Sequence, residues 1–347
     1  MIMASKKIKN KEKKAIRAGH RNSTESSTVL ITGASGRLGR RLCSAMLADG
    51  ITVRCLINQH NQMNMLPAGV VPYIGDITDR DALKKACEGA DTVYHLAAIV
   101  SQHSHSPKEI VRVNAHGTAA ILEASEFGGV GRFVFPSSVD VYGRVRKEVL
   151  TEESALHPTD MYGHSKMLAE QQIMKFGGRI GYTILRMATM YGPGFEGSFF
   201  KVFKMIKKGS LYIIGDGSNN LSLVHIKDVI NAMILAKNSR ISAYRVYNLS
   251  DGRAYTQLQL VDMAAKKLDA PVPSKHINPA IARMFSKAAG VDPDELRFIT
   301  SNRVIDISRI RKELGFVPKI NINVATKELV DEFLRGYKDR KSFENND

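Results

Sequence analysis

The sequence predicts an α/β fold built on a doubly wound parallel sheet, with a smaller lobe at its C-terminal end. Short apolar stretches typical of buried strands alternate with stretches of helical periodicity along most of the chain. A strand, a glycine-rich turn and a helix also follow one another near the start. With 347 residues, of which 44% are hydrophobic, the chain can bury one large core and a smaller second one.

The first expected elements are a strand at 29–31, a turn at 32–39 and a helix that reaches Leu47. Gly33 allows a tight turn, Gly36 lets backbone amides approach a pyrophosphate, and Gly39 lets the helix pack on the strand. The N–H groups and dipole of the helix N-terminus favour such an anion. An ordinary βα turn is the alternative, because the spacing is G-x-x-G-x-x-G and not G-x-G-x-x-G. The predicted cofactor-binding residues of this turn are Gly33, Ser35, Gly36, Arg37, Leu38 and Gly39.

Tyr162 and Lys166 form the second informative pattern. Residues four apart on a helix are neighbours, so the ammonium can lie beside the phenol. A free phenol titrates near pH 10, but a fixed cation favours the phenolate, which makes Tyr162 a usable general acid/base. A surface pair is the alternative, and the glycine turn upstream weighs against it. The two patterns together predict oxidoreductase chemistry on a bound nicotinamide.

Along nearly the whole chain after Thr28, the sequence resembles the extended short-chain dehydrogenase/reductase family. This family includes nucleotide-sugar epimerases and dehydratases, 3β-hydroxysteroid dehydrogenases and dihydroflavonol-type reductases. The matching stretches, in family order, are 32–39, 75–79, 91–98, 113–118, 133–138, 162–166, 185–186 with 190–194, and 215–217. The resemblance implies a Rossmann-type sheet, an NAD(P)-dependent enzyme without a metal, and a homodimer.

The resemblance also implies a third catalytic residue. Aligning on the stretch 141–143 puts Ser138 in that position, with Ser137 as the second choice. The hydroxyl would hold the substrate oxygen while Tyr162 moves the proton, so each group acts where charge develops in the transition state. Lys166 would bind the cofactor ribose as well as lower the tyrosine pKa. Asn114 resembles a family position that steadies the central strands by a hydrogen bond.

The end of the second expected strand has no carboxylate that could accept hydrogen bonds from the ribose hydroxyls of the cofactor. In NAD-preferring relatives an acidic residue stands there, whereas this chain has Ile57 or Asn58. Arg37 in the glycine turn, assisted by His60, would meet a 2′-phosphate, although a solvated arginine is the alternative. The sequence therefore favours NADP modestly over NAD. The other residues that the resemblance places against the cofactor are Asn58, Asp76, Ile77, Leu96, Ala97 and Ala98, the last three with plain core packing as the alternative.

Leu221 departs from the pattern of nucleotide-sugar enzymes, which carry an arginine there for the substrate diphosphate. A leucine cannot make that charge-assisted contact, although Arg253 or Arg303 could restore it. The stretch from 272 to 318 resembles the hydroxysteroid and dihydroflavonol branch. We therefore expect hydride transfer to or from an apolar secondary alcohol or ketone. The alternatives are a nucleotide-sugar epimerase or dehydratase with tightly held NAD, and a non-catalytic NAD(P)-binding regulatory module.

Charge and composition bound the remaining possibilities. Eight basic residues against two glutamates give the stretch before the first strand six of the sixteen net positive charges. We expect this basic tail to be disordered and solvated. Contact of the tail with nucleic acid or with a membrane surface is the less favoured role. No apolar run reaches the length of about twenty residues needed to span a bilayer. We expect a cytoplasmic protein with buried, reduced thiols at Cys43, Cys55 and Cys87.

The expected organisation has four parts. Residues 1–28 form the basic tail, and 29–190 form the nucleotide-binding domain, to which the chain returns at about 225–250. Residues 191–224 and 251–338 form the substrate-binding lobe, and 339–347 a frayed C-terminus. Since ligands of open parallel sheets bind at the carboxyl ends of the strands, a small-molecule substrate is expected between the lobes.

Overall fold

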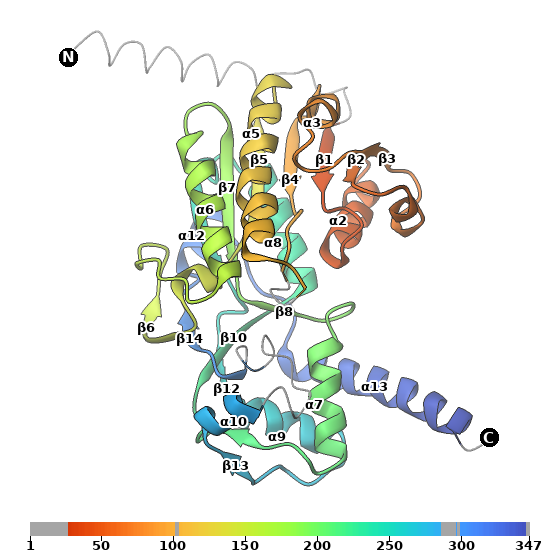
Figure 1. The fold of residues 1–347 in the computed structure, drawn as a ribbon, viewed down its shortest axis with the longest axis vertical. Helices are drawn as coiled ribbons and strands as arrows, with labels where there is room; N and C mark the ends of the chain where they lie inside the picture. Colours follow the sequence, from red (N-terminus) through yellow and green to blue (C-terminus); the bar gives the residue numbers. More distant parts are fainter. Residues whose placement is uncertain (1–26, 101–103, 286–295, 297–298, 345–347) are drawn as a thin grey trace. The chain divides into compact units, whose positions relative to one another are not determined.

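The computed structural model describes residues 27–100, 104–285, 296 and 299–344 (Figure 1). The predicted basic tail lies almost wholly outside the described residues. The chain divides into two compact units, which are described separately. The first comprises the chain up to residue 141 together with 160–186 and 233–247, and the second comprises 142–159, 187–232 and the remainder. The stretch 142–159 thus belongs to the second unit, although it lies inside the predicted nucleotide-binding range.

A seven-stranded sheet with strand order β11-β7-β5-β4-β1-β2-β3 organises the first unit. Its strands are β1 (Thr28–Thr32), β2 (Thr52–Ile57), β3 (Val71–Ile74), β4 (Thr92–His95), β5 (Arg132–Ser138), β7 (Gly181–Met187) and β11 (Arg245–Leu249). The pairs β1–β2, β1–β4, β2–β3 and β4–β5 are parallel. The order reverses between β1 and β4, which is the switch point where doubly wound folds bind dinucleotides. The predicted Rossmann-type α/β fold is confirmed.

Helices alternate with these strands, as the sequence pattern predicts. Their bounds are α2 (Arg37–Ala48), η1 (His60–Met65), α3 (Arg80–Cys87), α4 (Pro107–Val111), the π-helical η2 (Arg112–His116), α5 (Gly117–Phe127), η3 (Val139–Tyr142), α6 (Met161–Lys175) and α8 (Ile226–Asn238). Figure 1 shows α5 between α3 and α6 over one face of the sheet. The Asp160 carboxylate caps α6 by accepting from the Gly163 N–H at 2.9 Å, which fixes where the helix of the predicted catalytic pair begins.

The core of the first unit lies between the sheet and these helices. Leu30, Phe133, Phe135 and Ile121 are 0% exposed and belong to one apolar cluster. Burying a side chain of this size stabilises the fold by about 1.5 to 3 kcal/mol. The three cysteines are buried and free, as expected. The sulfur atoms of Cys43 and Cys55 lie 3.5 Å apart.

Three small sheets and several helices make up the second unit. Its strands pair in the orders β12-β10-β8, β13-β9 and β14-β6. The strands are β6 (Val145–Leu150), β8 (Thr189–Tyr191), β9 (Ile213–Ile214), β10 (Asn220–His225), β12 (Ala254–Thr256), β13 (His276–Ile277) and β14 (Asn302–Ile305). The helices are α7 (Gly197–Lys207), α9 (Gln257–Lys267), α10 (Pro279–Phe285), α12 (Ser308–Leu314) and α13 (Ile322–Glu344).

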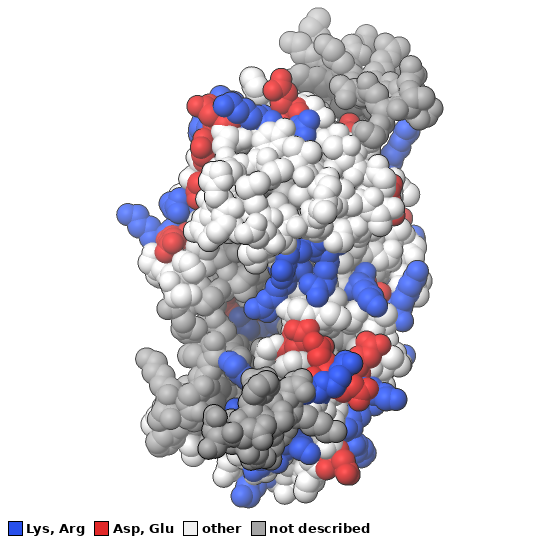
Figure 2. All heavy atoms as spheres, turned by 90° about the vertical axis from the view of Figure 1, so that its right-hand side faces the viewer, with Lys and Arg blue, Asp and Glu red and all other residues white. Residues whose placement is uncertain are grey.

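A separate apolar cluster forms the core of the second unit. Tyr191, Phe203, Leu223 and Leu329 are among its buried members. Helix α13 runs to Glu344 and so passes through most of the stretch expected to fray. Among the described residues, no helix is both long enough and apolar enough to cross a membrane. Lysines and arginines form several small groups beside acidic groups on the face drawn in Figure 2.

Candidate active site

The glycine turn after β1 has the shape of an anion cradle. Gly33 has φ +64°, and a Cβ there would lie 2.7 Å from the Ala97 backbone nitrogen. A Cβ at Gly39 would lie 2.3 Å from the Gly33 carbonyl oxygen. Only glycine therefore fits these two positions. Gly36 is the N-cap of α2 and has no side chain with which to cap the first turn. The N–H groups in the first turn of α2 can therefore bind a pyrophosphate.

The other predicted cofactor residues occupy the carboxyl ends of β2 to β4. Ile57 is 2% exposed, so Asn58 is the first exposed residue after β2. Its predicted place at the cofactor ribose stays a prediction. Arg37 and His60 are also exposed. Leu96, Ala97 and Ala98 are half-buried after β4, and the Ala97 N–H donates to the Thr32 hydroxyl at 3.1 Å.

Asp76 is held as an ionised carboxylate. It accepts from the Thr78 hydroxyl at 2.6 Å and from the Thr78 N–H at 2.9 Å, and Arg112 Nη1 lies 3.7 Å away. The Thr78 hydroxyl, followed by its N–H and Arg112, lowers the pKa of Asp76 against the effect of burial. The neighbouring Ile77 is only 6% exposed and packs against Gly117 in the core. Core packing, the ordinary role of such a side chain, therefore accounts for most of the Ile77 surface.

Tyr162 and Lys166 lie beside each other in the first two turns of α6. Lys166 Nζ is 6.0 Å from the centroid of the Tyr162 ring and 4.4 Å from that of Phe135. The ammonium donates to the Pro136 carbonyl at 2.9 Å and is 3% exposed. Burial lowers the pKa of Lys166 to about 7, and the Glu170 carboxylate acts in the opposite direction. When it is protonated, a lysine in this position favours the phenolate form of Tyr162.

Ser138 is the last residue of β5 and is 8% exposed. Its oxygen accepts from the Asp140 N–H at 3.1 Å. A hydroxyl that accepts in this way still has its own proton to donate to a substrate oxygen. Ser137, the second choice, instead donates to Glu170 Oε1 at 2.6 Å inside the protein. The geometry therefore favours Ser138 as the third residue.

Asn114 is buried in η2, and its amide group makes three hydrogen bonds to two residues, Ile99 and Ser165. Its Nδ2 donates to the Ile99 carbonyl and to the Ser165 hydroxyl, both at 2.9 Å. Its Oδ1 accepts from the Ile99 N–H at 2.7 Å. These bonds tie the segment after β4 to α6, next to Lys166. A direct contact between Asn114 and the cofactor stays a prediction.

Three buried polar residues near this site were not singled out from the sequence. Glu170 lies one turn after Lys166 and pairs with Arg186 of β7 at 2.7 Å. His95 of β4 lies between the hydroxyls of Thr32, at 2.8 Å, and Thr118, at 3.0 Å. Burial, and after it the charge of Lys166, lower the pKa of His95 to about 3. The spacing of four residues from Lys166 was the one sequence signal that could have identified Glu170.

The residues that the sequence connects with substrate choice lie in the second unit. Leu221 is 4% exposed on β10, opposite Tyr255 of β12. Arg303 is 5% exposed and donates to the Gly143 carbonyl at 3.1 Å, so this part of its guanidinium is already engaged. Arg253 is exposed. It lines a hollow of about 730 Å³ with Ala254, Tyr255, Gln259, Asp262, Met263, Lys266, Lys267 and Asn323.

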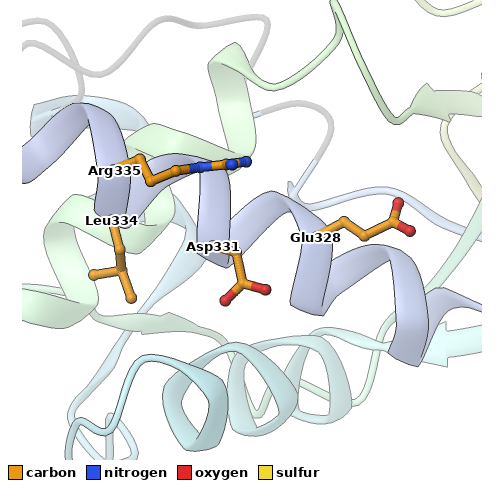
Figure 3. Close-up of a pocket in the computed structure, with 4 residues that line it drawn as sticks. All are labelled: Glu328, Asp331, Leu334 and Arg335. Atoms are coloured by element: carbon orange, nitrogen blue, oxygen red, sulfur yellow. The ribbon is translucent and has the colours of Figure 1, made fainter.

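Another hollow, of about 450 Å³, is lined by Glu328, Asp331, Leu334 and Arg335. Figure 3 shows that all four come from α13. A binding site usually has polar groups that converge from several elements, and this hollow contains none of the predicted site residues. We therefore do not assign it a part in the chemistry. The described residues also include no group of histidine, cysteine or acidic side chains that could hold a metal ion.

Comparisons with known proteins show which families and relatives the chain resembles. The model of the NAD dependent epimerase/dehydratase family matches residues 29–250. The N-acetyl-alpha-D-glucosaminyl-diphospho-ditrans,octacis-undecaprenol 4-epimerase of Escherichia coli O157:H7 is 31% identical over 253 residues, which cover 72% of this chain and 75% of the relative. Sterol demethylase protein B of Methylococcus capsulatus is 29% identical over 313 residues, which cover 84% of this chain and 94% of the relative. One of these relatives is named as an epimerase and the other as a sterol demethylase protein, so the comparisons do not resolve the branch, and the predicted nearness to the hydroxysteroid branch stays a prediction.

Solved structures give the same fold. The structure of MoeE5 in complex with UDP-glucose and NAD has a TM-score of 0.73 and 25% identity, and the match covers 90% of this chain and 99% of that one. Both the family description and this structure name NAD. The expected preference for NADP has no support from them.

Proposed function

Since the chain belongs to the NAD-dependent epimerase/dehydratase family, we propose that it transfers a hydride between NAD and a secondary alcohol or ketone, with Tyr162 as the general acid/base. The observation that carries the proposal is the buried Lys166 ammonium, 6.0 Å from the centroid of the Tyr162 ring on the same helix. This pair follows, in the same unit, the glycine cradle at the carboxyl end of β1. An enzyme is thereby favoured over the non-catalytic module.

The residues of the first unit fit a dinucleotide. The cradle of Gly33, Gly36 and Gly39 leaves no room for a Cβ at two of its three positions and faces the start of α2. Here the backbone would hold the pyrophosphate, Asp76 the adenine amino group, and Lys166 the ribose hydroxyls. When bound, NAD supplies an acceptor or donor for the hydride at C4 of its nicotinamide.

In the proposed mechanism, Lys166 keeps its positive charge next to Tyr162 and lowers the pKa of the phenol. In the oxidation direction the phenolate takes the proton of the substrate hydroxyl. In the reduction direction the phenol donates a proton to the carbonyl oxygen. Ser138 donates a hydrogen bond to that oxygen and orients it, because the charge on it changes during the reaction.

For the substrate we propose a largely apolar or unphosphorylated alcohol. Leu221 is the supporting observation, because it is buried against the opposite strand where nucleotide-sugar enzymes of the family carry an arginine. A hydrophobic pocket separates substrates that differ by one methylene by only about 1 to 3 kcal/mol. Several related alcohols should therefore react.

The second candidate is a 4-epimerase that acts on a sugar linked through a diphosphate. The Escherichia coli relative, whose name states such a substrate, favours it. The hollow lined by Arg253, Lys266 and Lys267 offers positive charges in the second unit. An epimerase returns the hydride to its own intermediate, so it retains its cofactor through each turnover.

Two measurements test the proposal and separate the candidates. Mass spectrometry of the purified protein shows whether NAD copurifies, as expected of an epimerase, or is absent, as expected of a dehydrogenase that exchanges cofactor. A panel of steroid-like, flavonoid-like and alicyclic alcohols is then compared with UDP-, GDP- and dTDP-sugars and a polyprenyl-diphosphate sugar. A change in nicotinamide absorbance reports turnover of the alcohols, and product stereochemistry reports turnover of the sugars. Turnover of a diphosphate-linked sugar alone would promote the second candidate.

A further inference from the structure

Glu170 is a fully buried carboxylate in the first unit with two kinds of partner. Arg186 approaches both of its oxygens, through Nε at 3.1 and 3.2 Å and through Nη2 at 2.7 Å. The Ser137 hydroxyl donates to Oε1 at 2.6 Å. The exposed fractions of the Arg186 and Glu170 side chains are 5% and 0%. A buried ion pair of this kind is costly to desolvate and is weak evidence of stabilisation by itself, so its placement calls for another explanation.

Glu170 joins three elements through Arg186 and Ser137, and two of these elements, α6 and β5, carry the proposed catalytic residues. Glu170 lies on α6 one turn after Lys166, and Ser137 precedes Ser138 on β5. Arg186 comes from β7, which is the next strand beyond β5 in the sheet. The carboxylate therefore fixes the end of β5 against the catalytic helix at the level of Ser138.

Glu170 also determines the charges around Lys166. From α6 the ammonium faces Tyr162 and Glu170, and from β4 it faces His95, whose low pKa keeps the imidazole neutral. From β5 it meets the Pro136 carbonyl and the Phe135 ring. From β7 the Arg186 charge lies behind Glu170. Without the carboxylate, two buried cations would share this space with no anion between them.

We propose that Glu170 is a positioning residue that keeps Lys166 protonated and directed at Tyr162, with Arg186 and Ser137 holding the carboxylate in place. The role of Glu170 rests on the proposed function of Lys166. It differs from an ordinary structural ion pair because its effect depends on the negative charge and not on the shape of the side chain. Burial opposes the proton on Lys166, and the Glu170 charge favours it.

The test is an NMR titration of Lys166 in the full-length protein labelled with ¹³Cε-lysine, with the signal assigned by its loss in Lys166→Met. Glu170→Gln keeps the shape and can still bind Ser137, but it removes the charge. We expect the Lys166 titration midpoint to fall by about one pH unit or more. Glu170→Asp keeps the charge and should leave the midpoint near that of the wild type.

Glu126→Gln is the matched control. It removes a carboxylate from another ion pair of the same unit, with Arg179 at 3.2 Å, where the glutamate is 46% exposed. The Lys166 midpoint should not move in this variant. If Glu170→Gln does not fold, Arg186→Lys replaces it: both charges remain, so the midpoint should stay near the wild-type value even where turnover falls.

A Lys166 midpoint that is unchanged in Glu170→Gln, or that falls equally in Glu170→Asp, would overturn the proposal and leave the pair a structural one. A fall of the midpoint in Arg186→Lys would overturn it as well. The titration needs no substrate. A failure of the proposed function would instead appear as unchanged turnover in Tyr162→Phe, so the two failures can be told apart.

Discussion

Two regions of the molecule differ in how far their buried polar groups are matched: the surroundings of α6 in the first unit, and the paired ends of β8 and β10 in the second. Around the catalytic helix of the first unit, Lys166, Glu170 and Asn114 each have named partners at hydrogen-bonding distance. In the second unit, the Tyr191 hydroxyl and His225 Nε2 are buried and have no hydrogen-bond partner among the described residues. The two rings lie 5.2 Å apart, at the paired ends of β8 and β10.

This contrast separates chemistry from specificity. A satisfied buried network holds its side chains in one arrangement, as acid/base catalysis requires. The paired ends of β8 and β10, with two unmatched buried groups, and Leu221 in place of an expected arginine tell less about what the second unit binds. The first unit should therefore respond to substitution through turnover and cofactor affinity, whereas the second should respond through the choice of substrate.

The largest effect is expected at Tyr162. Tyr162→Phe removes the proton transfer but leaves the cofactor cradle intact, so turnover should fall by about 10² to 10⁴-fold with nearly unchanged NAD affinity. Lys166→Met should lower both turnover and NAD affinity, because it removes the ammonium that is proposed to serve both. Steady-state kinetics and fluorescence titration measure the two quantities. An unchanged rate in Tyr162→Phe would remove this residue from the mechanism.

The glycine cradle gives the next largest effect. Gly33→Ala combines a left-handed φ with a Cβ only 2.7 Å from the Ala97 nitrogen, so we expect a loss of about 2 to 5 kcal/mol in unfolding free energy and weak NAD binding. Gly50→Ala is the matched control, because Gly50 has φ +72° and nothing within 4 Å of its added Cβ. It should cost about 1 to 2 kcal/mol and leave NAD binding alone. Urea unfolding of both variants decides whether the close approach, and not the φ angle, is the constraint.

The contrast between the units also explains what the sequence could predict. The strand, glycine turn and helix, and the spacing of Tyr162 and Lys166, are local patterns with a direct geometric reading. Glu170 and Arg186 meet across 16 residues through the pairing of a helix with a strand, which no local pattern shows. Ile77 is predicted to lie against the cofactor, which stays a prediction, and its contact with Gly117 depends on how α5 packs, which no local pattern shows. The sequence alone could not identify the substrate, because exposed residues such as Arg253 follow no periodicity.

A smaller effect is expected at the adenine end. Asn58→Asp should raise the ratio of NAD to NADP affinity about tenfold, because the new carboxylate accepts from the ribose hydroxyls and repels a 2′-phosphate. Asn64→Asp adds the same charge at another exposed position of the same region and should change the ratio little. Fluorescence titration with both cofactors measures it. Equal shifts in the two variants would mean that Asn58 does not face the ribose.

The smallest effect distinguishes the two candidate substrates. Arg253→Gln removes an exposed charge from the hollow of the second unit, where the arginine interacts with the Tyr255 hydroxyl and the Asp251 carboxylate. With an apolar alcohol as substrate, kcat/KM should change less than about twofold, as is usual for a surface substitution. With a diphosphate-linked sugar, loss of a charge-assisted contact should raise KM about tenfold while kcat holds. Lys266→Gln is the control, because this lysine lines the same hollow and also has a protein partner, Asp262 at 2.8 Å. A tenfold rise in KM confined to Arg253→Gln would assign the hollow to a phosphate group, whereas equal small effects in both variants would leave it as solvated surface.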